Sequence, residues 1–150
     1  MRALVQRVSE ASVTVHEPKH FAEIKNGMVI LLGVKDNDTD ADLKFVADKC
    51  CNLRIFEDEN EKMNLSLKDI NGEVLVVSQF TLYGDSRKGN RPSFIEAARP
   101  EFAEETYNKF IERIKSNLGD DKVKNGIFWS MMLVKIFNNG PVTILVESKE

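Results

Sequence analysis

The segment RALVQRVSEASVTVH, from Arg2 to His16, carries the pattern that decides the fold class. Apolar and polar side chains alternate over Arg2–Val8 and again over Ser12–His16, which is the two-residue period of a half-buried β-strand. Two further apolar runs, Met28–Val34 and Val74–Val77, are short and continuous, as strands of a sheet interior are. The sequence therefore predicts a strand-rich protein.

Two helices complete an α+β pattern. After N-cap candidates at 38–40, apolar residues recur at helical spacing from Leu43 to Cys50. A longer helix opens at Pro100, a position that tolerates proline, and Gly119 is its expected end. Its apolar stripe consists of Ala103, Tyr107, Phe110, Ile111 and Ile114.

Further strands and turns are expected between these elements. Asn26-Gly27 and Asn71-Gly72 are typical of two-residue hairpin turns. Residues 79–93 show no period and contain Gly84, Gly89 and Pro92, so they predict a long loop. The remaining strands are expected at Phe21–Ile24, Leu53–Phe56, Glu73–Ser78, 127–137 and 142–147.

Composition limits the class of protein. The 150 residues are 42% hydrophobic and 30% charged, with no linker or repeat, so a single domain over 1–150 is expected. A net charge of −3 argues against coating nucleic acid through bulk charge, but permits a local basic patch. No apolar run approaches the length of a membrane span. Cys50 and Cys51 are adjacent, which is poor geometry for a disulfide, so we expect a reducing cytoplasm.

The inventory of catalytic groups is small. His16 and His20 are the only histidines, and His16 is most simply a surface residue of a strand. No metal-binding spacing, nucleophile elbow or glycine-rich phosphate loop is present. The sequence therefore predicts no metal, no cofactor and no conventional catalytic triad.

Two segments nevertheless stand out. Ser78-Gln79-Phe80-Thr81-Leu82 follows a buried strand, where hydroxyl and backbone N–H groups either bind a ligand or simply complete the strand end. Asn138–Thr143, which contains Gly140-Pro141, is most simply a connecting turn, and a cis bond there cannot be asserted from sequence.

A basic loop lies between these two segments. Arg87, Lys88 and Arg91 stand in the glycine-containing stretch 84–92. Such cations either hold phosphates beside a binding pocket or are merely solvated.

Taken together, the chain closely resembles the D-aminoacyl-tRNA deacylase family. The shared residues are Met1–Val8, Ala11–Val13, Gly33-Val34, Asn52–Phe56, Lys62–Leu67, Ser78–Tyr83, Arg87–Gly89, Arg91–Phe94, Asn138 and Gly140–Thr143. The order and spacing of the Ser78–Leu82 and Gly140–Thr143 motifs make this resemblance specific.

The resemblance implies a fold, an activity and a partner. The fold is a ββα layered sandwich, and the activity is hydrolysis of the ester that joins a D-amino acid to the terminal adenosine of tRNA, a proofreading step in translation. The protein would be a homodimer whose active sites are shared across the interface.

It also implies roles for individual residues. Ser78, Gln79, Phe80 and Thr81 line the site of the ester. Gly140 and Pro141, through a cis bond, form a chiral gate that enters the partner's pocket. The remaining assignments are Arg7 as the brace of the gate, Phe128, Trp129 and Met132 beside the adenine, and Arg87, Lys88 and Arg91 toward the tRNA.

The chemistry implied is water attack assisted by the ribose 2′-OH, with backbone N–H groups near Phe80 stabilising the oxyanion. Thr81 then positions substrate, although a covalent Thr81 esterase has the same sequence. A backbone gate that rejects an L side chain sterically should partly admit glycine.

The chain departs from the family pattern where Trp129 stands in place of a glycine. Its indole either stacks on a base or narrows the pocket. If it closes the pocket, the chain is instead a homodimeric module that binds tRNA or other nucleic acid without hydrolysis. Asn139, where aspartate is common in the family, is a milder change.

Overall fold

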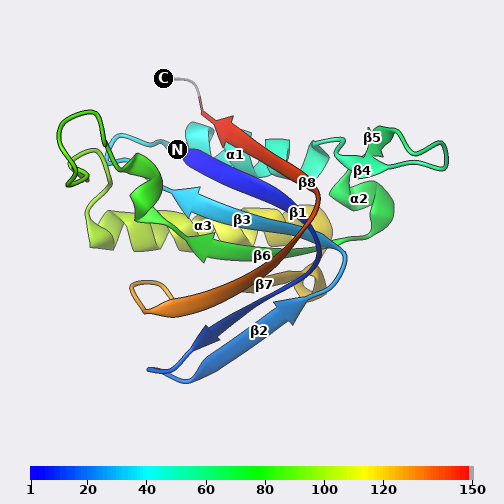
Figure 1. Cartoon of the computed structure of the whole chain (residues 1–150), viewed down its shortest axis with the longest axis horizontal. Helices are drawn as coiled ribbons and strands as arrows, with labels where there is room; N and C mark the ends of the chain where they lie inside the picture. The colour runs from blue at the N-terminus through cyan, green and yellow to red at the C-terminus, as the bar shows by residue number, and fades with distance from the viewer. Residues whose placement is uncertain (149–150) are drawn as a thin grey trace.

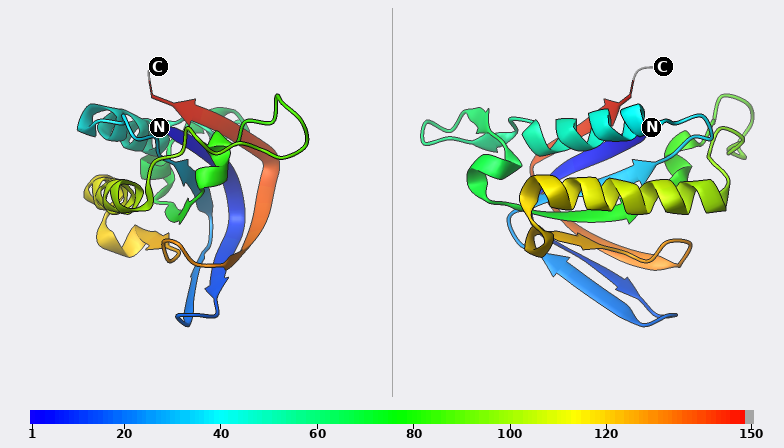
Figure 2. Two further views of the ribbon diagram at one scale, coloured as in Figure 1. Left: turned by 90° about the vertical axis from the view of Figure 1, so that its left-hand side faces the viewer. Right: turned by 180° about the vertical axis from the view of Figure 1, so that it is seen from behind.

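The computed structural model describes residues 1–148, and the expected domain extends two residues beyond that part. Two long helices, α1 (Asp40–Asn52) and α3 (Pro100–Leu118), lie side by side against one face of a mixed sheet (Figures 1 and 2). This arrangement confirms the predicted α+β fold with two main helices.

The long first strand organises the sheet. β1 (Arg2–Val15) pairs through its first half with β3 (Gly27–Gly33) and through its second half with β2 (His20–Ile24). On its other side β1 pairs along almost its whole length with β8 (Met132–Glu147). The order β2-β1-β3 continues through β6 (Glu73–Ser78), parallel to β3, to β7 (Val123–Asn125).

Two apolar cores lie between three layers of secondary structure. The larger core lies between the helices and the sheet, and it includes Val46, Ile30 and Phe110. The smaller core lies between β3–β6 and the second half of β1, with Val13 and Leu75 in its interior. The sheet thus folds back on itself, giving one helical and two β layers (Figure 2).

Shorter elements fill the connections. β4 (Phe56–Glu57) and β5 (Met63–Leu65) form a small separate sheet that is followed by α2 (Leu67–Ile70). Two 3₁₀ turns, η1 (Phe80–Tyr83) and η2 (Asp120–Lys122), follow β6 and α3. Capping boxes at Thr39 and Ser66 start α1 and α2, as their side-chain hydroxyls accept backbone hydrogen bonds.

Both predicted hairpin turns are wrong. Asn26-Gly27 connects β2 to β3, but these strands pair with β1 rather than with each other. Gly27 is required for another reason, because a Cβ there would lie 1.8 Å from the carbonyl oxygen of Glu73. Asn71 ends α2 in the left-handed conformation, and β6 then runs parallel to β3.

Several predicted boundaries are also wrong. The two N-terminal strands are one continuous strand, and the strand expected at 53–56 is reduced to Phe56–Glu57. The predicted loop 79–93 contains η1. The two C-terminal strands are one, because β8 runs through residues 138–141 instead of turning there, and residues 127–131 lie outside it.

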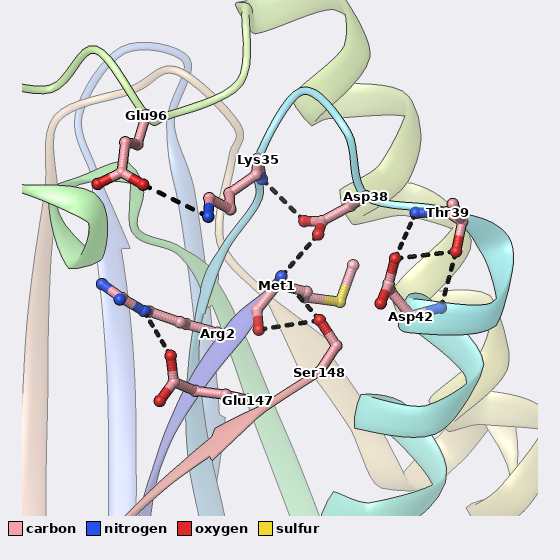
Figure 3. A network of polar contacts seen from close by, with 9 residues as sticks. All are labelled: Met1, Arg2, Lys35, Asp38, Thr39, Asp42, Glu96, Glu147 and Ser148. Carbon is pink, nitrogen blue, oxygen red and sulfur yellow. Dashed lines mark hydrogen bonds and ion pairs between the residues drawn. The ribbon is translucent and has the colours of Figure 1, made fainter. Parts of the chain in front are cut away.

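Met1 and Ser148 lie side by side next to the loop before α1 (Figure 3). The buried ammonium group of Met1 lies 2.6 Å from Oδ1 of Asp38 and donates a hydrogen bond to Oγ of Ser148. The other carboxylate oxygen of Asp38 accepts a hydrogen bond from the backbone N–H of Lys35. This network fixes the start of β1 and the end of β8 to the loop before α1.

Candidate functional site

A cavity of about 610 Å³ opens where β3 and β6 end. These two strands are parallel, so their carboxyl ends lie at the same edge of the sheet, a common location for ligand sites. The loop after η1 and the loop before β8 lie at the same end of the molecule (Figure 1). The lining residues are mostly apolar: Leu32, Val34, Val77, Ser78, Gln79, Phe80, Phe94, Ala97, Ala98, Pro100, Ala103, Phe128, Trp129, Ser130, Met131, Met132 and Val134.

Polar groups enter this cavity at the end of β6. Ser78, Gln79 and Phe80 all line it. Gln79 is held to β3 by a 2.8 Å hydrogen bond from its N–H to the carbonyl of Leu32. The first backbone hydrogen bond of η1 runs from Leu82 N–H to Gln79 O. Within residues 1–148, the N–H groups of Phe80 and Thr81 donate no hydrogen bond, so they remain for a ligand.

Thr81 lies beside the cavity rather than among its lining residues. Its hydroxyl oxygen accepts a hydrogen bond from the side-chain amide of Gln79. An amide is neither a proton acceptor of useful basicity nor a charged group, so this contact orients the hydroxyl without activating it.

Aromatic rings form one side of the site. Tyr107 is buried, donates a 2.9 Å hydrogen bond to Val76 O, and packs against Phe128 with ring centroids 5.9 Å apart. Burial raises the pKa of the Tyr107 phenol, which therefore stays neutral. Phe128 is followed by Trp129, whose ring lies nearly parallel at 6.2 Å. The cavity wall is thus anchored in the core.

Phe94, which the sequence did not mark as part of the site, also lines the cavity. Its ring meets that of Phe80 edge to face, with centroids 5.2 Å apart. Ala97, Ala98 and Met131 also line the cavity and were missed. These residues stand in irregular segments, where no periodicity marks a buried or pocket-facing side chain.

The basic loop does not line the cavity. Arg87 forms a forked ion pair with Asp85, at 2.8 and 2.7 Å, which holds the pKa of that carboxyl well below its usual range. Lys88 and Arg91 take part in none of the ion pairs formed within residues 1–148. Of the three cations predicted for this loop, only Lys88 and Arg91 therefore carry a charge that no carboxylate among residues 1–148 neutralises.

Gly140 and Pro141 lie elsewhere, in a bulge of β8. Gln6 pairs with Thr143 and Val8 with Asn138, so residues 139–142 stand opposite Arg7 alone. The Gly140-Pro141 bond is cis. Both residues are exposed, and neither lines the cavity of this subunit.

The buried Arg7 side chain supports that bulge. Its Nε donates to the carbonyl of Asn139 at 3.1 Å, and its Nη1 donates to the carbonyl of Ile55 at 2.8 Å. Glu57 lies 3.9 Å from Nη2. Gly140 has φ +122°, and a Cβ there would lie 2.8 Å from Nη2 of Arg7, so glycine is required.

Asn138 closes the bulge from its other side. Its amide nitrogen donates to the carbonyls of Arg7 and Val142, both at 3.0 Å. The bulge is thus fixed by side chains from β1 and β8 and by the chain before β4. The contributions of Ile55 and Glu57 had no signal in the sequence.

Residues 1–148 show neither a membrane-spanning helix nor a cluster of metal ligands. No helix in that part has the length and apolar character of a membrane span. No group of three or more His, Cys, Asp or Glu side chains gathers there to hold a metal ion.

Comparison with known proteins identifies the class to which this fold and site belong. Residues 4–147 match the family described as D-Tyr-tRNA(Tyr) deacylase. The chain is 51% identical to a D-aminoacyl-tRNA deacylase of Flavobacterium psychrophilum, covering 99% of this chain and 98% of that protein. For the deacylase of Thermosipho africanus the identity is 54%, covering 100% and 99%.

Solved structures share the fold of this chain. A structure titled c-Myc DNA Unwinding Element Binding Protein superposes with a TM-score of 0.93 at 43% identity, covering 100% of both chains. A probable eukaryotic D-amino acid tRNA deacylase shares the fold at 16% identity, with a TM-score of 0.84 over 97% of this chain and 98% of that one. The chain therefore belongs to the D-aminoacyl-tRNA deacylase family.

Proposed function

We propose that this protein hydrolyses the ester between a D-amino acid and the terminal adenosine of tRNA, and that its sites are shared between two subunits. The observation that carries the proposal is the cavity at the end of β6, where Ser78, Gln79 and the free N–H of Phe80 meet an apolar wall. Family membership supplies the reaction, which is that of an ester hydrolase.

The ester carbonyl binds at the start of η1. The Phe80 and Thr81 N–H groups precede the first hydrogen bond of that turn and are suited to the oxyanion that forms when water attacks. An aminoacyl ester is already activated, and the neighbouring ribose 2′-OH assists the attack. The protein contributes orientation and electrostatic stabilisation, which need no triad.

Thr81 positions substrate and is not acylated. Its hydroxyl contacts only the amide of Gln79 among the described side chains, and that amide is not a general base. Thr81→Val should therefore keep D-aminoacyl-tRNA hydrolysis within about tenfold of the wild type. A loss comparable to that of an essential nucleophile, about 10⁴-fold or more, would instead support the covalent mechanism.

Chirality is read by the backbone of Gly140 and Pro141 from the partner subunit. Their carbonyls accept hydrogen bonds from the substrate α-ammonium, so an L side chain is directed into rigid backbone while a D side chain points outward. Rigidity is consistent with the contacts of Arg7 and Asn138 on either side of the bulge. Glycyl-tRNA lacks the excluded side chain and should be hydrolysed partly; complete resistance would argue against a steric gate.

The homodimer is supported by the exposed face of β8. Leu133, Phe137 and Leu145 occupy exposed positions of this strand, with Lys135 between the first two, and are 62%, 54% and 48% exposed. An apolar row of this kind is typical of a surface that another protein covers. Because Gly140 and Pro141 lie in the same strand, pairing of two copies here would carry each bulge toward the other subunit.

A second candidate function is a module that binds nucleic acid without hydrolysis. It is favoured by Trp129, which is 73% exposed beside the cavity, and by the DNA-binding title of the structure at 43% identity. The two functions are separated by incubating the protein with D-tyrosyl-tRNA and L-tyrosyl-tRNA, with and without EDTA. Hydrolysis of the D form alone, unaffected by EDTA, is expected; retention of tRNA with no hydrolysis of either form would favour the binding module.

A further inference from the structure

We propose that Trp129 is a stacking platform for the nucleobase that precedes the terminal adenosine. This inference rests on the proposed function, because that function places the terminal adenosine in the cavity. It adds a second base-binding position at the exposed rim of the cavity, on a residue that this chain has in place of the glycine expected from the family resemblance.

The exposed indole is held at the cavity mouth at a conformational cost. Trp129 has φ +63°, and the only other non-glycine residues with positive φ are Glu61 and Asn71 among those described. A bulky side chain is a real outlier in this region, which glycine occupies freely. The side chain is 73% exposed, so burial of the indole in this subunit does not compensate for that conformation.

The indole also continues an ordered row of rings. Tyr107 is anchored in the core, Phe128 packs on it and lines the cavity, and Trp129 lies at 24° to Phe128 with centroids 6.2 Å apart. The row thus runs from the cavity wall to solvent. An exposed aromatic face fixed in this way is the usual means of binding unpaired bases without reading their sequence.

The direction of the substrate selects the base. The ester is on the ribose of the terminal nucleotide, so the reacting end points toward Ser78 and Phe80 and the rest of the RNA must leave through the mouth. The first group to reach the exposed rim of the cavity is the preceding nucleotide. Trp129 and its neighbour Met131, which is 92% exposed, are the apolar surfaces that it meets there.

Charge on this rim favours a stacked base over a phosphate as the direct contact. Segment 128–132 contains no charged residue, while the uncompensated cations Lys88 and Arg91 belong to the loop that precedes Phe94 and do not line the cavity. The platform therefore recognises an uncharged ring, and the phosphate backbone is left to the basic loop.

The test uses the fluorescence of Trp129, which is the only tryptophan in the chain. The wild-type protein is titrated with adenosine 5′-monophosphate, which fills the cavity alone, and with the dinucleotide CpA, which adds the preceding base. CpA should quench the fluorescence more strongly and bind on the order of tenfold more tightly, as expected for one base–aromatic stack. Equal affinity and equal quenching would overturn the proposal.

Variants separate stacking from other roles of the indole. Trp129→Gly should fold, since glycine relieves the backbone strain, and calorimetry should show that it loses the advantage of CpA over the mononucleotide. Trp129→Phe should keep most of that advantage. Phe45→Ala, which truncates an exposed aromatic on α1, is the matched control and should change neither affinity.

Kinetics distinguish failure of this inference from failure of the proposed function. Trp129→Gly should raise the KM for D-tyrosyl-tRNA about tenfold more than the KM for D-tyrosyl-adenosine, which lacks the preceding nucleotide. An unchanged KM for the tRNA would refute the platform alone. Wild-type protein that cleaves neither substrate would refute the proposed function. Trp129 fluorescence that changes with protein concentration but not with CpA would place the indole in a protein interface and refute the platform.

Discussion

Arg7 offers the sharpest perturbation of the proposed gate. Replacing it by lysine keeps the positive charge but loses the fork that holds Asn139 O and Ile55 O together, at 3.1 and 2.8 Å. A hydrogen bond from a charged group contributes about 1.5–3 kcal/mol, and a single ammonium can replace only one of the two well. The loss of about 2 kcal/mol corresponds to about 30-fold in an equilibrium constant.

That loss should appear as reduced chiral discrimination. The bulge of residues 139–142 would spend more time in arrangements that admit an L side chain, so Arg7→Lys should raise the ratio of L- to D-tyrosyl-tRNA hydrolysis by about 10- to 30-fold. Initial rates with both substrates measure this ratio, and urea unfolding measures the stability of the variant.

Arg113→Lys is the matched control. Arg113 also forms a forked contact, with both oxygens of Asp48 at 2.8 Å, but it joins α3 to α1 far from the bulge along the chain. It should lower stability without altering discrimination. If Arg7→Lys loses stability like the control and leaves the ratio unchanged, Arg7 supports the fold and not the gate.

Three further outcomes follow from the fold. Hydrogen bonds from α3 hold the pKa of the Asp48 carboxyl well below its usual range. About 1 kcal/mol of unfolding free energy should therefore be present above pH 4 and be lost as the pH falls below it. Asp48→Asn should remove this pH dependence when the unfolding free energy is measured with urea at several pH values. Burial raises the pKa of Cys51 to about 11 and that of Cys50 further, so neither thiol should react with Ellman's reagent until the protein unfolds; rapid reaction in buffer would contradict this. Gly27→Ala should lower the unfolding free energy by more than about 3 kcal/mol, because the added Cβ would clash with the backbone of Glu73. An unfolding free energy close to that of the wild type would show that β6 does not pass so close to Gly27.

The sequence predicted those parts of the fold that local pattern determines. Alternation in β1 and the apolar stripe of α3 are direct consequences of burying one face, and both are present. The hairpin at Asn26-Gly27 was wrong because the same dipeptide serves a close backbone approach to Glu73. Which strands pair is decided by the whole sheet, and two adjacent residues do not contain that information.

The candidate site also contains residues that a local sequence pattern marks and residues that no such pattern marks. The segment that begins at Ser78 stands out because a buried strand gives way to polar residues there, and Ser78 and Phe80 line the cavity. Phe94 and Met131 reach the cavity from irregular segments, which have no period to interpret. Gly140 was expected in a turn, but it occupies a bulge of a continuous strand, since Arg7 and Asn138 satisfy the backbone groups that the bulge frees.

In the proposed mechanism each active site is completed by the other subunit, so the activity of a monomeric variant tests the mechanism directly. Phe137 lies three residues before Gly140 and is 54% exposed on β8, so Phe137→Asp should separate the subunits without disturbing either core. Phe45→Asp, on the helical layer, controls for adding a charge at an exposed aromatic.

The measurement is the hydrolysis of D- and L-tyrosyl-tRNA by these two variants, with their mass determined by sedimentation. We expect the Phe45→Asp protein to remain a D-selective dimer, and the Phe137→Asp protein to be a folded monomer without D-selective hydrolysis. A folded monomer that still cleaves the D form and rejects the L form would contradict the shared site.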